Sequence, residues 1–183
     1  SLSLSLSLSF FFFFLSFSFI SLLPCSHGGK HNFVDWFPDI TGFAKKSCVR
    51  PDSGRMPMAA GCAFYHDPRV IAAFYNYIRH LVTHVSNYTG LALKDDPVVL
   101  AWETGNELVG EPSDWTRNLT NFLKNELGVQ QLVMDGRNMN THGQDPLWPS
   151  EPAVDLTTGH FYPMNTPNIA RQAAQAVRDG KVK

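Results

Sequence analysis

The sequence has little net charge, few cysteines and no glycine-rich phosphate loop, and each absence excludes a class of function. Its 15 basic and 16 acidic side chains give a formal net charge of -1, so nothing electrostatic favours nucleic acid or an anionic membrane as a partner. Cys25, Cys48 and Cys62 lack metal-ligand spacing and predict one disulfide or none. No serine or cysteine nucleophile motif is present either. We therefore expect neither a nucleotide-binding fold nor a serine or cysteine hydrolase.

The N-terminal segment has no basic side chain, since no Lys or Arg precedes Lys30. A signal peptide needs a basic start, and a membrane-spanning helix needs about 20 mostly apolar residues, which the alternating serines of residues 1–9 dilute. Residues 1–19 contain only Ser, Leu and Phe, all of which have pyrimidine-only codons. We therefore expect residues 1–23 to be unfolded, as translated pyrimidine-rich DNA or a damaged signal peptide, with a membrane anchor as the alternative. The folded domain is expected over residues 24–183.

Helical and strand patterns alternate after a loop-like stretch over residues 24–66, which is rich in Gly, Pro and Ser. Asp67-Pro68 predicts a helix start, with an apolar stripe on one face and an end near residues 87–90. The stripe consists of Ile71, Phe74, Ile78, Leu81, Val82 and Val85. Further strands are predicted over 97–102, 132–136 and 154–162, and further helices over 113–128 and 166–180. This alternation predicts a parallel α/β sheet, either a barrel or an open doubly wound sheet.

Two short motifs stand apart from this pattern. The tripeptides Asn87-Tyr88-Thr89 and Asn118-Leu119-Thr120 are N-glycosylation sequons, which are compatible with secretion. His80 and His84 lie one helical turn apart, a spacing that suits a metal ion, but no third ligand is evident. We expect these histidines to lie on a solvated helix face and predict no metal site.

The most informative segment follows the predicted strand at residues 97–102. It places Glu103, Asn106 and Glu107 at the carboxyl end of a buried strand, where barrel enzymes carry their catalytic groups. Two carboxylates and an amide are costly to desolvate there without a function. The structural alternatives are that Glu103 pairs with an arginine inside a barrel and that Asn106 and Glu107 cap the next element.

The segment Trp102-Glu103-Thr104-Gly105-Asn106-Glu107 resembles the strand-4 Asn-Glu motif of glycoside hydrolase family 5, in particular its fungal endo-β-1,4-mannanase-like members. Other segments are similar to that group in the same order and spacing: Gly28–Lys30, Phe33–Trp36, Phe64–Pro68, Asn87–Gly90, Lys94–Pro97, Leu132–Gly136 and Asp155–Met164. The resemblance covers roughly residues 28–183. It implies a partial (β/α)8 TIM barrel that contains about strands 3–6 and their helices.

The resemblance also implies roles for individual residues. Glu107 would be the general acid/base, and Asn106 would donate a hydrogen bond to the sugar 2-hydroxyl. His160, Tyr162 and Trp102 would bind the substrate. The nucleophile of the family follows strand 7, so it is expected to be absent from this chain, and the chain alone is expected to have little or no activity.

The implied reaction is retaining hydrolysis of β-1,4 bonds in a plant-wall polysaccharide, most simply mannan, by a secreted monomer. Neither a metal nor an organic cofactor is expected, and the polysaccharide is the expected partner, without nucleic acid or membrane. A β-1,4-glucanase of the same family and a non-catalytic sugar-binding barrel fragment remain the alternatives.

Overall fold

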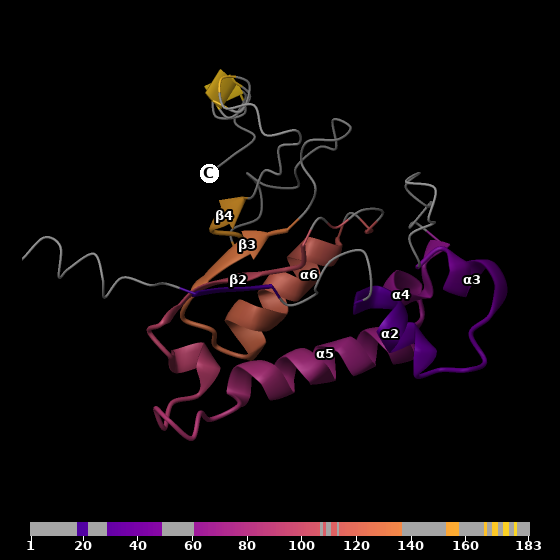
Figure 1. The fold of residues 1–183 in the computed structure, drawn as a ribbon, viewed down its shortest axis with the longest axis horizontal. Coiled ribbons are helices and arrows are strands. Elements are labelled where there is room, and N and C mark those ends of the chain that lie inside the picture. Colours follow the sequence, from indigo (N-terminus) through magenta and orange to yellow (C-terminus); the bar gives the residue numbers. More distant parts are fainter. Residues whose placement is uncertain are drawn as a thin grey trace, which may run out of the picture.

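The fold was analysed in a computed structural model, in which a parallel sheet lies beside a group of helices (Figure 1). The structure describes residues 18–21, 29–48, 61–106, 108, 111–112, 114–136 and 153–157, and, in a C-terminal helix, residues 167, 170–171, 174–175 and 178.

The sheet has four parallel strands whose spatial order follows the chain: β1 (Ser18–Ser21), β2 (Val99–Glu103), β3 (Leu132–Asp135) and β4 (Leu156–Thr157). Right-handed crossovers between parallel strands in this order place all connecting helices on one face of the sheet. The helices after β1 and β2 do pack side by side, since Tyr75 and Phe122 have ring centroids 4.5 Å apart. This arrangement is that of a barrel segment, whereas a doubly wound sheet has helices on both faces. The predicted parallel α/β class is confirmed.

Strand β1 lies within residues 1–23, so the prediction that this segment is unfolded is wrong for residues 18–21. The backbone of β1 pairs in parallel with β2, with Phe19 opposite Ala101 and Ser21 opposite Glu103. The strand forms because β2 offers an otherwise open edge whose backbone groups need partners. The composition of the segment contains no sign of that partner, which lies about 80 residues further along the chain.

The predicted helix start at Asp67-Pro68 is confirmed by α5 (Pro68–Thr83). The Asp67 side chain accepts a hydrogen bond of 2.9 Å from the backbone N–H of Arg69, and Pro68 occupies the first helical position. The buried face of α5 consists of Val70, Phe74, Ile78 and Val82.

The end of α5 differs from the prediction, because the helix stops at Thr83 and not near residues 87–90. Val85 forms an antiparallel bridge to Ala92, and its side chain is 53% exposed, so the prediction that it faces the core is wrong. A turn between these two residues and the short 3-10 helix η2 (Leu93–Asp95) then connect α5 to β2.

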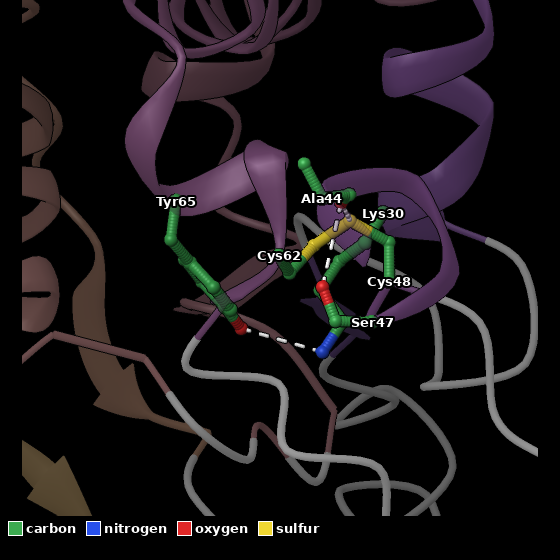
Figure 2. Close-up of a disulfide and its surroundings, with 6 residues drawn as sticks. All are labelled: Lys30, Ala44, Ser47, Cys48, Cys62 and Tyr65. Atoms are coloured by element: carbon green, nitrogen blue, oxygen red, sulfur yellow. Dashed lines mark hydrogen bonds between the residues drawn. A yellow bond between two sulfur atoms is a disulfide. The ribbon is translucent and has the colours of Figure 1, made fainter. Parts of the chain in front are cut away.

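Three short helices occupy the stretch that was predicted as loop: α2 (Gly29–Asp35), α3 (Gly42–Lys46) and α4 (Ala63–His66). They are too short for an apolar periodicity to be recognised in the sequence. Tertiary contacts stabilise them instead. A disulfide between Cys48 and Cys62 joins the end of α3 to the start of α4 (Figure 2), and both sulfur-bearing residues are buried.

The core between the helices is aromatic. Phe33 of α2, Phe64 of α4 and Phe74 of α5 pack with ring centroids 5.0 to 5.9 Å apart. Trp115 stacks on Phe74 at 5.7 Å and lies 5.3 Å from Phe64. These edge-to-face and stacked contacts join four helices into one hydrophobic core.

The predicted helix over 113–128 is observed as α6 (Trp115–Asn121), followed by a π-helical segment, η3 (Phe122–Glu126). Its large apolar residues are buried: Trp115, Leu119, Phe122, Leu123 and Leu127. Gly128 follows with a φ of +67°, the left-handed conformation that commonly ends a helix. The six described residues after position 166 are helical, in agreement with the predicted C-terminal helix.

Candidate active site

The candidate site residue that the structure describes, Asn106, lies beyond the carboxyl end of β2. Asn106 is half-buried and follows the end of this strand by three residues. Ala101 and Trp102 point to opposite faces of the sheet and are both fully buried, so β2 is covered on both sides. The predicted site residues Glu107, His160 and Tyr162 lie outside the described residues.

The structure contradicts the prediction that Trp102 binds substrate. Its side chain is fully buried in the hydrophobic core, and its indole N–H donates a 3.0 Å hydrogen bond to Oε1 of Gln131. Gln131 in turn donates to the backbone carbonyls of Leu93 and Asp96, at the amino end of the sheet. Trp102 therefore stabilises the core and does not face a sugar.

The loop that carries Asn106 and position 107 is attached to the end of β3 by three hydrogen bonds. The backbone N–H of Thr104 donates to Met134 O, and the Thr104 hydroxyl accepts from the N–H of Gly136, both at 3.0 Å. The N–H of Leu108 donates to Gly136 O, also at 3.0 Å. Thr104 and Leu108 are buried, so these bonds are protected from water. The backbone is thus held on both sides of position 107.

Gly136 is the residue that allows this close approach. A Cβ atom at position 136 would lie 1.4 Å from the carbonyl oxygen of Gly105, which leaves no room for any side chain. Sequence reasoning placed Gly136 at the end of the predicted strand 132–136 but missed its contact with the loop after β2. The available signal was that a glycine follows each of the two neighbouring strands, at positions 105 and 136.

A buried carboxyl group, Asp135, ends β3 beside this loop. It is 1% exposed, and its Oδ1 accepts a 3.4 Å hydrogen bond from the hydroxyl of Thr116 in α6. Because Asp135 is enclosed, it is placed to orient its neighbours and not to contact a polysaccharide.

A buried cation, Lys30, lies among the short helices that follow β1. It is 6% exposed; its Nζ donates to the hydroxyl of Tyr65 at 3.5 Å and lies 5.2 Å from the centre of that ring (Figure 2). Burial lowers the pKa of the Lys30 amine, and the negative charge of Glu111 acts in the opposite direction. Lys30 therefore links α2 to α4 through Tyr65.

The alternative sites find no support in the described part of the chain. The rings of His80 and His84 have centroids 6.2 Å apart, but no group of three or more potential metal ligands occurs among the described residues. None of the helices described is long and apolar enough to cross a bilayer.

Comparison with known proteins agrees with the sheet and with the motif at the end of β2. Residues 25–179 match the family described as GH family 5 beta-mannosidase-like. Among curated proteins, mannan endo-1,4-beta-mannosidase 2 of Oryza sativa subsp. japonica is 24% identical over 163 residues, which cover 86% of this chain and 32% of the rice protein. The protein of the same name from Arabidopsis thaliana is 27% identical, with coverage of 75% and 35%. The chain thus spans about a third of the length of these relatives.

Two solved structures share the fold. A glycoside hydrolase family 5 mannosidase from Rhizomucor miehei has a TM-score of 0.61 at 20% identity and matches 83% of this chain and 40% of its own. The endo-beta-1,4-mannanase from Thermotoga petrophila has a TM-score of 0.59 at 24% identity, with coverage of 88% and 38%. The parallel sheet and its helices are therefore part of a (β/α)8 barrel. The match over residues 25–179 shows that this chain belongs to the GH family 5 beta-mannosidase-like family.

Proposed function

We propose that this chain belongs to a secreted, monomeric enzyme that hydrolyses β-1,4 bonds of mannan with retention of configuration. The observation that supports the proposal is the loop after β2, in which Asn106 follows the carboxyl end of a parallel strand. The names of the matched plant proteins favour mannan over a β-1,4-glucan as the substrate. In this proposal β1 to β4 correspond to barrel strands 3 to 6.

Glu107 is proposed to carry the proton. A glycosidic oxygen is a poor leaving group, so a carboxylic acid must protonate it as the bond breaks, and the resulting carboxylate then activates water. A rigid loop favours this reaction because the acid must stay within hydrogen-bond distance of that oxygen. The three hydrogen bonds from Thr104, Gly136 and Leu108 supply this rigidity on both sides of position 107.

Asn106 is proposed to donate a hydrogen bond to the 2-hydroxyl of the sugar that occupies the site. This bond strengthens as the ring gains oxocarbenium character, so it lowers the barrier and does more than bind substrate. His160 and Tyr162 are proposed to line the same cleft. A retaining reaction also needs a second carboxylate about 5–5.5 Å from the first, and we assign that role to none of the described residues.

The test compares the variants E107Q and E126Q. Each is made in the longest protein that the gene encodes and also in the 183-residue chain. Glu126 is 65% exposed and lies in η3, so its replacement controls for loss of a carboxylate elsewhere. We expect E107Q to lower mannan hydrolysis by about 10²- to 10⁴-fold, the usual contribution of a general acid/base, and E126Q to leave it unchanged.

Leaving-group dependence sharpens this test. A dinitrophenyl mannoside needs no protonation, so the first step of its hydrolysis should be much less affected by E107Q than that of mannan. Equal activity of E107Q and the parent on mannan would contradict the proposal. Hydrolysis of carboxymethyl-cellulose in preference to mannan would overturn the choice of substrate.

A further inference from the structure

The turn between α5 and β2 carries the first sequon, Asn87-Tyr88-Thr89, and residues 87–91 of this turn are exposed. Asn87 and Thr89 are both exposed, and the Tyr88 side chain is 100% accessible. The acceptor amide, the hydroxyl two residues later and the residue between them thus all face solvent. A completely exposed tyrosine is unusual for so large a side chain, and a sugar on Asn87 would lie next to it.

The turn is closed by backbone hydrogen bonds, and the Thr89 hydroxyl adds a weaker one by accepting from the N–H of Leu91 at 3.3 Å. The two ends are closed by backbone hydrogen bonds: the N–H of Ser86 donates to Leu91 O at 2.9 Å, and the N–H of Gly90 donates to Ser86 O at 2.8 Å. Gly90 adopts a φ of +70°, the left-handed conformation that glycine tolerates. A bulky group on Asn87 would therefore leave the fold intact.

The second sequon lies in a different environment. Asn118 is within α6, and its side-chain amide donates a 3.2 Å hydrogen bond to Asp114 Oδ2. Leu119 and Thr120 are fully buried, and the Thr120 hydroxyl donates to the carbonyl of Arg117 at 3.1 Å. The hydroxyl that the glycosylation machinery must recognise is thus enclosed in the helical core.

The disulfide supplies an independent argument about the compartment. The bond between Cys48 and Cys62 is buried and joins α3 to α4, so it belongs to the folded structure. Structural disulfides form in the secretory pathway and are rare in the cytosol. The disulfide therefore favours maturation in the compartment where N-glycosylation takes place.

We propose that Asn87 is an N-glycan acceptor and that Asn118 is not. In this step the side-chain nitrogen of Asn87 attacks the anomeric carbon of a lipid-pyrophosphate-linked oligosaccharide. An N-glycosidic bond forms, the bond between that carbon and the pyrophosphate oxygen breaks, the amide loses a proton, and the lipid pyrophosphate leaves. The inference rests on the proposed secretion and is independent of the proposed hydrolase activity.

The glycan would lie away from the proposed sugar cleft. The sequon turn belongs to the connection that leads from α5 into the start of β2 (Figure 1). Asn106 instead follows the end of that strand. In a barrel enzyme the amino ends of the strands face away from the active site. A glycan on Asn87 would therefore shield the amino end without blocking substrate.

The experiment expresses the full chain behind an added cleavable secretion signal in yeast and measures glycan occupancy by mass, so no activity is needed. We expect peptide N-glycosidase treatment in ¹⁸O-water to remove one glycan and to label Asn87. N87Q and T89A should abolish this mass shift, whereas T89S, which keeps the sequon, and N118Q should retain it. Since Asn87 and Thr89 are exposed, we expect all of these variants to fold; T89A loses one exposed hydrogen bond to Leu91, which T89S keeps.

Misfolded material is excluded by analysing only the fraction in which non-reducing peptide mapping finds the Cys48–Cys62 disulfide. In that fraction, an unmodified Asn87 would overturn the proposal. Equal occupancy of Asn118 and Asn87 would overturn the claim that burial of Thr120 protects the second sequon. Neither outcome affects the proposed role of Glu107.

Discussion

The two ends of the sheet use buried polar groups in different ways. At the amino end, Gln131 makes three hydrogen bonds that connect Trp102 and the chain before β2 to β3. At the carboxyl end, the bonds of Thr104, Leu108 and Gly136 connect one loop to another. The amino end thus ties regular elements together, while the carboxyl end holds irregular backbone in place. In a barrel enzyme, such held loops carry the chemistry.

The connecting segments at the two ends of the sheet also differ. At the amino end, the described chain from α5 to β2 is a short turn with a 3-10 helix, residues 84–98. Between β1 and α5, the chain instead forms three short helices, which a disulfide and an aromatic core stabilise. We therefore expect substitutions at the carboxyl end of the sheet to lower activity most. Substitutions at the amino end should lower only the free energy of unfolding.

Gly136→Ala should cause the largest loss of stability and activity, because it disrupts the close contact between Gly136 and the loop after β2. The new Cβ would overlap the carbonyl oxygen of Gly105, which is backbone, so the loop after β2 would have to shift. We expect a loss of about 3 kcal/mol in unfolding free energy and a large loss of mannan binding or hydrolysis. Chemical denaturation and activity assays of the longest gene product measure the two effects.

Gly90→Ala is the control for that experiment. Position 90 has open space around it but a φ of +70°, so alanine there meets only the backbone penalty of about 1 kcal/mol. If both glycine variants lost the same stability and kept their activity, the close approach at Gly136 would have no functional role.

Removing the disulfide should have the next largest effect. The bond closes a loop with a sequence separation of 14 residues, so C48S/C62S should lose about 3 kcal/mol of stability. C25S is the control, because it removes a thiol and leaves this disulfide in place. Denaturation midpoints under oxidising conditions measure the loss, and a double variant as stable as the parent would show that the aromatic core alone holds the short helices.

Gln131→Leu should destabilise the amino end without harming the proposed site. It leaves the indole N–H of Trp102 and the carbonyls of Leu93 and Asp96 without this partner, which costs about 2 kcal/mol. Gln130→Ala is a matched control one residue away, because Gln130 is exposed and bonds only to Gly128 O in the described structure. An activity loss per folded molecule in Q131L similar to that in G136A would erase the distinction between the two ends.

Local signals in the sequence predicted the parts of this structure that are local. Asp67 and Pro68 start α5 because a cap and a fixed φ act within one turn, and the apolar stripe of that helix follows from its period. The end of α5 was missed because it depends on the pairing of Val85 with Ala92. Strand β1 and the three short helices were missed for the same reason, since distant partners stabilise them.

The candidate site shows the same limit. The motif at residues 102–107 correctly predicted that Asn106 follows the end of a buried strand. It could not show which way Trp102 points, because β2 is buried on both faces and has no polar alternation to read. The hydrogen bond between Thr104 and Gly136 joins residues 32 positions apart in the sequence. Only the register of β2 and β3 brings these two residues together.

The smallest expected effect concerns the charge cluster at the start of α5. Arg69 bonds to both oxygens of Asp67, at 3.1 and 2.7 Å, and to Asp39 at 2.9 Å. These hydrogen bonds lower the pKa of Asp67 to about 2 and lower that of Asp39 as well. Since the folded pKa lies below the unfolded value of about 3.9, Asp67 adds stability above about pH 4, and this is lost as the pH falls toward 2.

Two variants separate the cap from the charge. Asn also caps helices, so D67N should keep most of the stability at pH 7 but show a weaker decline between about pH 4 and 2. D67A removes both functions and should lose about 1 kcal/mol at pH 7. Thermal unfolding of D67N and D67A across this pH range measures both effects. If the stability of D67N depended on pH as that of the parent does, solvent would be shown to screen the pairing of Asp67 with Arg69. Because the cluster is exposed, neither variant should alter the loop that carries position 107.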